Sequence, residues 1–84
     1  MNYLPWFEGQ ALSQMAGLPD EAFDVLAQTM ARICAGPYDR LFSRPMRAAD
    51  PSERMADLGD SGFIQFTVDD AKGLVHVYVL LWAG

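Results

Sequence analysis

The stretch that decides the fold is GFIQFTVDDAKGLVHVYVLLW, residues 62–82. Two segments rich in β-branched and aromatic residues, 62–68 and 74–82, flank the turn-forming loop 69–73 and predict an antiparallel hairpin. Alternation gives this hairpin an aliphatic face made of Ile64, Phe66, Val68, Val75, Val77, Val79 and Leu81. The other face is mixed and holds Phe63, Gln65, Thr67, Leu74, His76, Tyr78, Leu80 and Trp82. We expect the aliphatic face to form the core and the mixed face to stay open.

Two helices are predicted upstream of this hairpin. Between Pro19 and Gly36 the apolar residues recur at helical spacing, in a stripe made of Phe23, Leu26, Ala27, Met30, Ile33 and Cys34. Gly36-Pro37 ends this helix, because neither residue continues it well. A shorter helix follows Glu8, with an apolar face made of Leu12, Met15 and Ala16. We expect both apolar stripes to pack against the aliphatic face of the sheet.

The remaining segments complete a small sheet. Residues 3–7 predict a short edge strand, residues 54–58 a second short strand, and residues 59–62 a turn. Residues 37–53 hold three prolines and predict an irregular connection on the surface. The chain is therefore predicted to be one α+β domain, residues 1–84, with two N-terminal helices packed on a small antiparallel sheet. Its core should contain Phe23, Leu26, Met30, Ile33, Phe66, Val68, Val75, Val77 and Val79.

Composition restricts the class of protein further. The chain has 84 residues, of which 51% are hydrophobic, so one domain with one core is expected. Cys34 is the only cysteine, which excludes an internal disulfide and leaves no zinc-site spacing. No apolar run is long enough for a membrane span, and the N-terminus does not resemble a signal peptide, so we expect a cytoplasmic protein. Without a phosphate-binding glycine loop or a nucleophile elbow, neither a metal nor a cofactor is expected.

The charge of the chain is unevenly distributed. Eleven acidic residues against six basic ones give a formal net charge of −5. Proteins that bind nucleic acid through its phosphates usually carry an excess of positive charge, so DNA binding is not expected. Four of the six basic residues nevertheless fall in one stretch: Arg40, Arg44, Arg47 and Arg54. That stretch has a local positive balance.

Four stretches carry a family resemblance: Ala35-Gly36-Pro37-Tyr38, Arg54-Met55-Ala56-Asp57-Leu58-Gly59, and the hairpin strands at residues 62–69 and 74–79. With the predicted order of elements, they make the chain resemble the RelE/ParE toxin family of bacterial toxin–antitoxin systems. The resemblance covers almost the whole chain and implies a β-α-α-β-β-β order. It also implies ribosome-dependent mRNA cleavage or, in the ParE branch, poisoning of DNA gyrase, with a neutralising antitoxin as partner. The chain departs from the mRNA-cleaving members at Phe63, where many have arginine, and we expect a catalytic tail beyond the last strand to be missing.

The mixed sheet face and the resemblance together define candidate site residues. Metal-free RNA cleavage needs a base, an acid and a cation near the phosphate. His76 and Tyr78 share the mixed face, and Arg54 on the adjoining strand could lie near them, which makes these three the candidate catalytic residues. The RNA-binding candidates are Arg44, Arg47 and Gln65. The competing interpretation is that His76 and Tyr78 are ordinary half-buried strand residues and Arg54 is a solvated edge charge.

Three functions follow from different classes. The chain is a toxin-like domain with weak endoribonuclease chemistry, a non-catalytic relative that binds a protein such as gyrase, or an acidic domain whose mixed face mediates association. An apolar patch on that face favours a partner in each case, either an antitoxin segment or a second copy of the chain. The partner-binding candidates are Phe63, Leu80 and Trp82.

Overall fold

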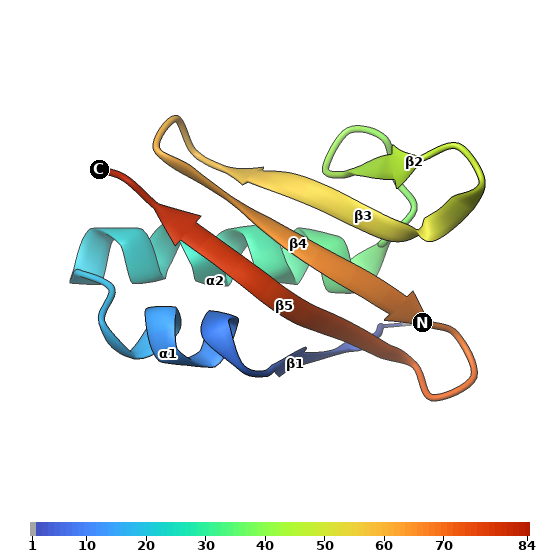
Figure 1. Ribbon diagram of the computed structural model, residues 1–84, viewed down its shortest axis with the longest axis horizontal. Helices are drawn as coiled ribbons and strands as arrows, with labels where there is room; N and C mark the ends of the chain where they lie inside the picture. Colours follow the sequence, from blue (N-terminus) through green and yellow to red (C-terminus); the bar gives the residue numbers. More distant parts are fainter. Residues whose placement is uncertain (1) are drawn as a thin grey trace.

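The computed structural model describes residues 2–84. Over this range the chain forms five strands and two helices: β1 (Leu4–Phe7), α1 (Gln10–Ala16), α2 (Asp20–Ala35), β2 (Arg44–Arg47), β3 (Asp50–Leu58), β4 (Gly62–Asp69) and β5 (Leu74–Trp82). The predicted α+β class, the two helices and the antiparallel hairpin of β4 and β5 are confirmed (Figure 1). No helix within residues 2–84 is long and apolar enough to cross a membrane.

The five strands form one sheet in the spatial order β1-β5-β4-β3-β2. Strands β2 to β5 are antiparallel neighbours, whereas β1 pairs with β5 in parallel. The sheet is therefore mixed rather than purely antiparallel as predicted. The physical reason is that most of the chain separates β1 from β5, and a long crossover is what a parallel pair requires. Pro5 and Pro45 lie in β1 and β2, the two edge strands, where a missing N–H is tolerated.

Part of the segment that was predicted to be irregular is strand. Arg44 pairs with Met55, and Arg47 pairs with Asp50, so β2 forms a second edge of the sheet. Strand β3 begins at Asp50, well before the predicted start at Arg54. The prolines of this segment hid the strand in the sequence, because proline usually argues against a strand. Pro45 is tolerated here because β2 is an edge strand with a register shift between Pro45 and Arg47.

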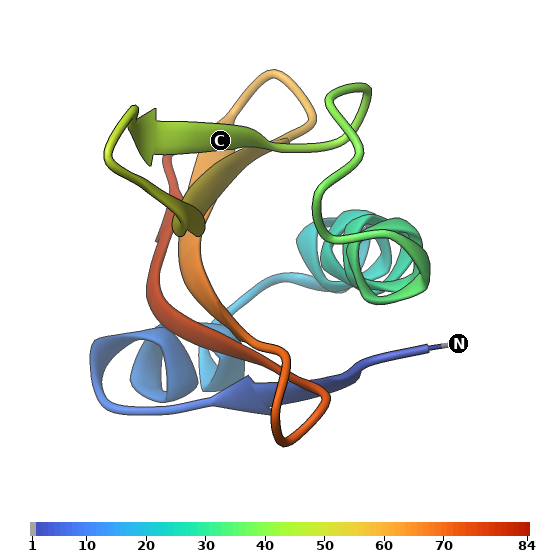
Figure 2. The same ribbon diagram turned by 90° about the vertical axis from the view of Figure 1, so that its right-hand side faces the viewer.

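Helix α2 crosses one face of the sheet and contacts β3 and β1, while α1 packs against β5 where β1 has ended (Figures 1 and 2). The buried hydrophobic residues of the core cluster are Ala11, Leu26, Met30, Ile33, Cys34, Ala56, Leu58, Ile64, Phe66, Val68, Val75, Val77 and Leu80. Four residues of the predicted helix stripes are exposed: Phe23 (48%) and Ala27 on α2, and Leu12 (50%) and Ala16 on α1. Ala22 and Ala11 are buried instead of Phe23 and Leu12. The rest of the α2 stripe is confirmed, since Leu26, Met30, Ile33 and Cys34 are buried.

A bulge in β5 changes the inside–outside pattern of the last strand. Gln65 pairs with Val79 and Phe66 pairs with Val77, so Tyr78 is an extra residue without a partner in β4. An extra residue reverses the alternation beyond it. Leu80 is accordingly fully buried and Trp82 packs against the core, whereas Leu81 is 45% exposed and Val79 is half-buried. The prediction of Leu80 and Trp82 on the open face is therefore wrong, as is the prediction of Val79 and Leu81 in the core.

The side chain of Gln10 continues the sheet edge beyond the end of β1. Its amide nitrogen donates a hydrogen bond to the Leu80 carbonyl at 2.9 Å, and its amide oxygen accepts one from the Leu80 N–H at 3.0 Å. Strand β1 pairs with β5 only as far as Val77. The amide of Gln10 therefore replaces one residue of a neighbouring strand and fixes the start of α1 against β5.

Candidate functional site on the open sheet face

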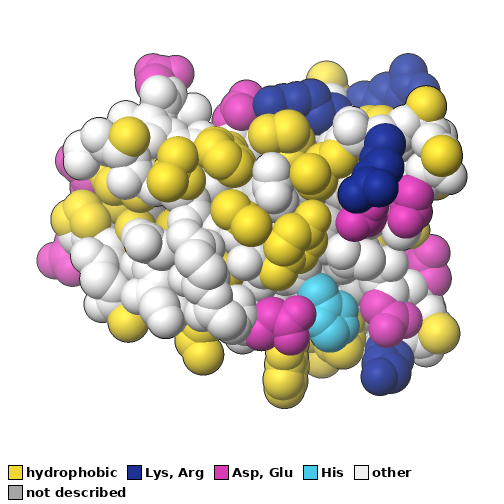
Figure 3. Space-filling view, in the orientation of Figure 1, with side chains coloured by type: hydrophobic (Ala, Val, Ile, Leu, Met, Phe, Trp, Pro, Cys, Tyr) yellow, Lys and Arg dark blue, Asp and Glu magenta, His cyan; other side chains and the backbone are white. Residues whose placement is uncertain are grey.

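The candidate site lies on the sheet face that α2 leaves uncovered. A row of four residues crosses the sheet in register: Trp6 on β1, His76 on β5, Thr67 on β4 and Glu53 on β3. Figure 3 looks onto this face and shows hydrophobic side chains across its middle, with the histidine below them and most of the Lys and Arg side chains at the upper right. The face thus combines an apolar centre with charged borders.

His76 lies at one border of this apolar centre. Its Nδ1 atom is 3.8 Å from the Oε1 atom of Glu8, the residue that follows β1. The His76 side chain is 28% exposed. Glu8 is held in place by its backbone N–H, which donates to the Val77 carbonyl at 3.1 Å. The parallel pairing of β1 with β5 therefore brings a carboxylate to the only histidine of the chain.

Tyr78, the extra residue of the bulge in β5, lies near β2, the edge strand on the far side of the sheet from β1. Its hydroxyl group donates to the sulfur of Met46 on β2 at 3.6 Å. Burial, and then the negative charge of Glu53, raise the pKa of Tyr78 above its usual value. Glu53 itself forms an ion pair of 3.0 Å with Arg47. His76 and Tyr78 thus share one face, as predicted, and Glu53 and Arg47 accompany them there.

Arg54 is not part of this group. It pairs with Phe66, a core residue, and its side chain consequently points to the α2 side of the sheet, where only 3% of the residue is exposed. The guanidinium donates to the Ser43 hydroxyl at 2.8 Å, to the Ser43 carbonyl at 3.1 Å and to the Pro51 carbonyl at 3.1 Å. It also lies 5.5 Å from the centre of the Tyr38 ring. The expectation that Arg54 lies near His76 and Tyr78 is therefore wrong.

The three RNA-binding candidates lie on or beside the open face, and both arginines are paired. Arg44 is 3.4 Å from the Asp57 carboxylate, and Arg47 pairs with Glu53. Gln65 is half-buried between Met55 and Val79 in the register of the sheet. Among residues 2–84, no group of three or more His, Cys, Asp or Glu side chains gathers in a way that could hold a metal ion.

The apolar part of the face differs from the predicted one. Phe63 is on it, in register with Leu81 on β5 and Asp57 on β3, but Leu80 and Trp82 point to the core side. Leu81 is 45% exposed and Met46 is 37% exposed, and both were missed by the sequence analysis. Glu8 was missed as well. Its signal would have been the parallel pairing of β1, which no local pattern reveals.

These elements, in this order and with this arrangement of strands, give the chain a RelE-like fold. Escherichia coli toxin RelE, in a variant with two arginines replaced, matches in its free state with a TM-score of 0.79 and 21% identity, over 95% of this chain and 82% of RelE. In complex with an antitoxin RelBc peptide, it matches with a TM-score of 0.80 and 20% identity, over 100% and 86% of the two chains.

The toxin–antitoxin complex RelBE2 from Mycobacterium tuberculosis matches with a TM-score of 0.78 and 14% identity, over 98% of this chain and 99% of the other. No family model matches the sequence. A search of curated proteins likewise found no significant match. The resemblance to the RelE/ParE family is therefore confirmed at the level of the fold, in a highly diverged sequence.

Proposed function

We propose that this chain is the toxin-type component of a toxin–antitoxin pair and that it acts by binding a protein through its open sheet face. The fold supports the first part, because the similar structures include RelE with an antitoxin RelBc peptide and the RelBE2 toxin–antitoxin complex. An antitoxin chain is accordingly the first partner we propose. A target protein such as gyrase, or a second copy of this chain, would use the same face.

The side chains of the open face support the second part of the proposal, that the chain acts by binding a protein. Its two arginines, Arg44 and Arg47, are each paired with a carboxylate, and the third candidate cation, Arg54, is withdrawn to the other side of the sheet. Binding of an RNA backbone depends on cations that are available to phosphates. Half-exposed apolar side chains with a polar border are instead typical of a protein interface. Protein binding therefore fits this face better than RNA cleavage does.

Induced expression in a bacterial host tests the proposal, with growth and mRNA integrity followed together. We expect growth arrest with intact mRNA. The double variant Phe63→Ser, Leu81→Ser should relieve the arrest, because it removes the apolar centre of the face without touching the core. Leu12→Ser is the matched control, since Leu12 is an equally exposed leucine on α1. A chain that leaves growth unaffected, or a double variant as toxic as the control, would contradict the proposal.

Ribosome-dependent mRNA cleavage is the second candidate function. It is favoured by the shared face of His76 and Tyr78, with Arg47 rather than Arg54 as the nearby cation. If the chain cleaves mRNA, His76→Ala and Tyr78→Phe should each lower the cleavage rate by about 10²-fold or more, the usual contribution of a general acid or base. Cleavage that survives both substitutions would eliminate this pair as the catalytic residues.

A further inference from the structure

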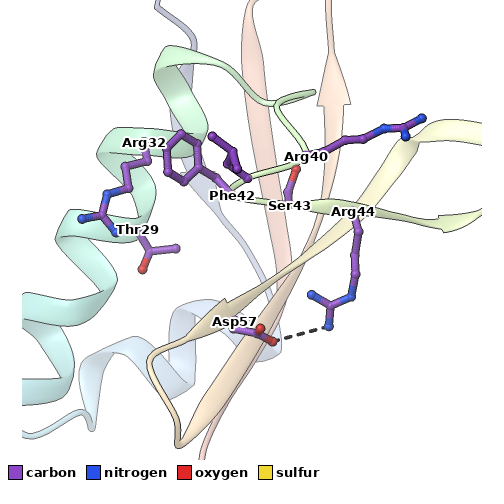
Figure 4. A pocket seen from close by; sticks show the side chains of 8 residues that line it. Thr29, Arg32, Arg40, Phe42, Ser43, Arg44 and Asp57 are labelled. Carbon is purple, nitrogen blue, oxygen red and sulfur yellow. Dashed lines mark hydrogen bonds and ion pairs between the residues drawn. The ribbon is translucent and has the colours of Figure 1, made fainter.

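A polar pocket lies away from the centre of the open face, between α2 and the edge of β3. Its volume is about 180 Å³, and it is lined by Thr29, Arg32, Arg40, Leu41, Phe42, Ser43, Arg44 and Asp57. These residues come from α2, from the connection after it, and from β2 and β3. Figure 4 shows Arg32 on one wall and Arg44 on the opposite one, with Phe42 between them and the Arg40 side chain extending away.

The pocket concentrates positive charge in an acidic protein. Three of the six basic residues line it, although the chain as a whole carries a net charge of −5. Within residues 2–84, Arg32 and Arg40 form no ion pair, and Arg44 has one exposed contact of 3.4 Å with Asp57. Arg32 is oriented by the Phe42 ring, whose centre lies 5.8 Å from its guanidinium carbon. Two arginine side chains, Arg32 and Arg44, thus line one pocket, with the carboxylate of Asp57 beside Arg44.

We propose that this pocket binds a phosphate group, either free or carried by a nucleotide. Guanidinium groups present several N–H donors in a planar fork that matches phosphate oxygens, so a pocket lined by several arginines suits a phosphate group. A pocket of 180 Å³ accommodates one such anion with a few waters. The pocket extends beyond the face proposed for protein binding, because Arg32 and Phe42 lie off the open face and only Arg44 and Asp57 lie at its border.

Asp57 sets the affinity of the pocket. Its carboxylate occupies Arg44 and repels an incoming anion, so a bound phosphate must share Arg44 with it. Removing this charge while keeping the size of the side chain should strengthen binding. The substitution Asp57→Asn therefore distinguishes two cases. It should raise the phosphate affinity of a true phosphate site, whereas an arginine cluster that only maintains solubility should show no specific phosphate binding with or without it.

Calorimetric titration and chemical-shift perturbation at low ionic strength test the proposal, with inorganic phosphate, adenosine monophosphate and a short acidic peptide as probes. We expect saturable binding of phosphate or of the nucleotide, with shifts at Thr29 and Phe42. Arg32→Gln and Arg44→Gln should each weaken binding about tenfold, the effect of one charge-assisted pair. Asp57→Asn should strengthen binding several-fold, and Lys72→Gln, at an exposed cation outside the pocket, should leave it unchanged.

The probes also identify the carrier of the phosphate. Equal affinity for both phosphate probes supports a free phosphate, and tighter binding of adenosine monophosphate supports a nucleotide. Three results would overturn the proposal: no saturable binding of either probe, binding indifferent to Arg32→Gln and Arg44→Gln, or equal affinity for the acidic peptide. Unfolding curves of each variant confirm that its fold is unchanged, as expected for exposed side chains.

Discussion

Arg54 is the residue for which the sequence and the structure disagree most. Its neighbours in the sequence and its charge suggest a cation at the surface, ready for a phosphate. In the structure its guanidinium is buried and is satisfied by neutral acceptors, and burial lowers its pKa from the usual value. A buried charge needs such a complete set of partners to be tolerated. Arg54 therefore holds the α2–β2 connection to β3.

We expect Arg54→Ala to destabilise the fold rather than to remove an activity selectively. The substitution leaves Ser43 and the Pro51 carbonyl without their donor and opens a cavity, which should cost on the order of 3 kcal/mol in the free energy of unfolding. Denaturant unfolding measures this loss. Arg40→Ala, at an exposed arginine of the same connection, is the control and should stay within about 0.5 kcal/mol of the native chain. Equal midpoints for the two variants would contradict a structural role.

At the scale of elements, the bulge at Tyr78 decides which side chains of β5 reach the core. Leu80 and Leu81 are adjacent and chemically identical, yet Leu80 is fully buried and Leu81 is 45% exposed. We expect Leu80→Ala to cost about 2–5 kcal/mol and Leu81→Ala less than about 1 kcal/mol in the free energy of unfolding. Strict alternation along β5 would bury Leu81 and expose Leu80, so it predicts the larger loss of stability for Leu81→Ala. Chemical denaturation of the two variants distinguishes the two registers directly.

A second contact connects three segments of the chain through one carboxylate: the N-terminal segment, the α2–β2 connection and the β4–β5 hairpin loop. Asp70, in the β4–β5 hairpin, accepts hydrogen bonds from the hydroxyl groups of Tyr3 and Tyr38. Burial, and then this bond, raise the pKa of Tyr38 to about 12, and the bond to Asp70 also raises the pKa of Tyr3. Because the folded pKa of Tyr38 lies above the unfolded value of about 10, its contribution to stability is complete below that pH and is lost as the pH rises towards 12.

Asp70→Asn should therefore lower the pKa of Tyr3 and Tyr38, because the ionised phenols no longer face a carboxylate. Tyr78 is the internal control, since its raised pKa is due to burial and to Glu53. Ultraviolet titration of single-tyrosine variants, with and without Asp70→Asn, measures the three groups separately. A shift at Tyr78 as large as at Tyr38 would show that the substitution acts through the fold rather than through the hydrogen bonds.

These elements also show how far the sequence is informative. Local periodicity was sufficient for α2 and for the β4–β5 hairpin, because helical and strand spacing are properties of neighbouring residues. The parallel partner of β1 and the bulge at Tyr78 depend on contacts between distant segments, and no local pattern encodes them. The candidate site was predicted where it depended on alternation before the bulge, as for Phe63 and His76. It was missed where it depended on pairing, as for Glu8 and Leu81.

The whole molecule presents an acidic surface with one positive region, and this combination restricts what it can bind. A net charge of −5 opposes the approach of a polyanion, while the pocket at Arg32 and Arg44 can receive one phosphate. We expect no binding of duplex DNA at physiological salt in filter-binding assays. Any binding of a short oligonucleotide should decline with salt with a logarithmic slope of about −1 to −2, as for one or two neutralised phosphates. A slope several times steeper would contradict this charge distribution.

The amide of Gln10 has a consequence for solubility. Strand β5, LVHVYVLLW, has no residue that is permanently charged, and an uncovered edge of such a strand is a template for intermolecular pairing. Strand β1 covers its first half, and Gln10 occupies both hydrogen-bonding groups of Leu80 beyond it. We expect Gln10→Ala to aggregate at a lower temperature than Gln14→Ala, an exposed substitution on the same helix, as measured by light scattering during heating. A single glutamine side chain would then be what keeps the most apolar strand of this small protein from pairing with other copies of itself.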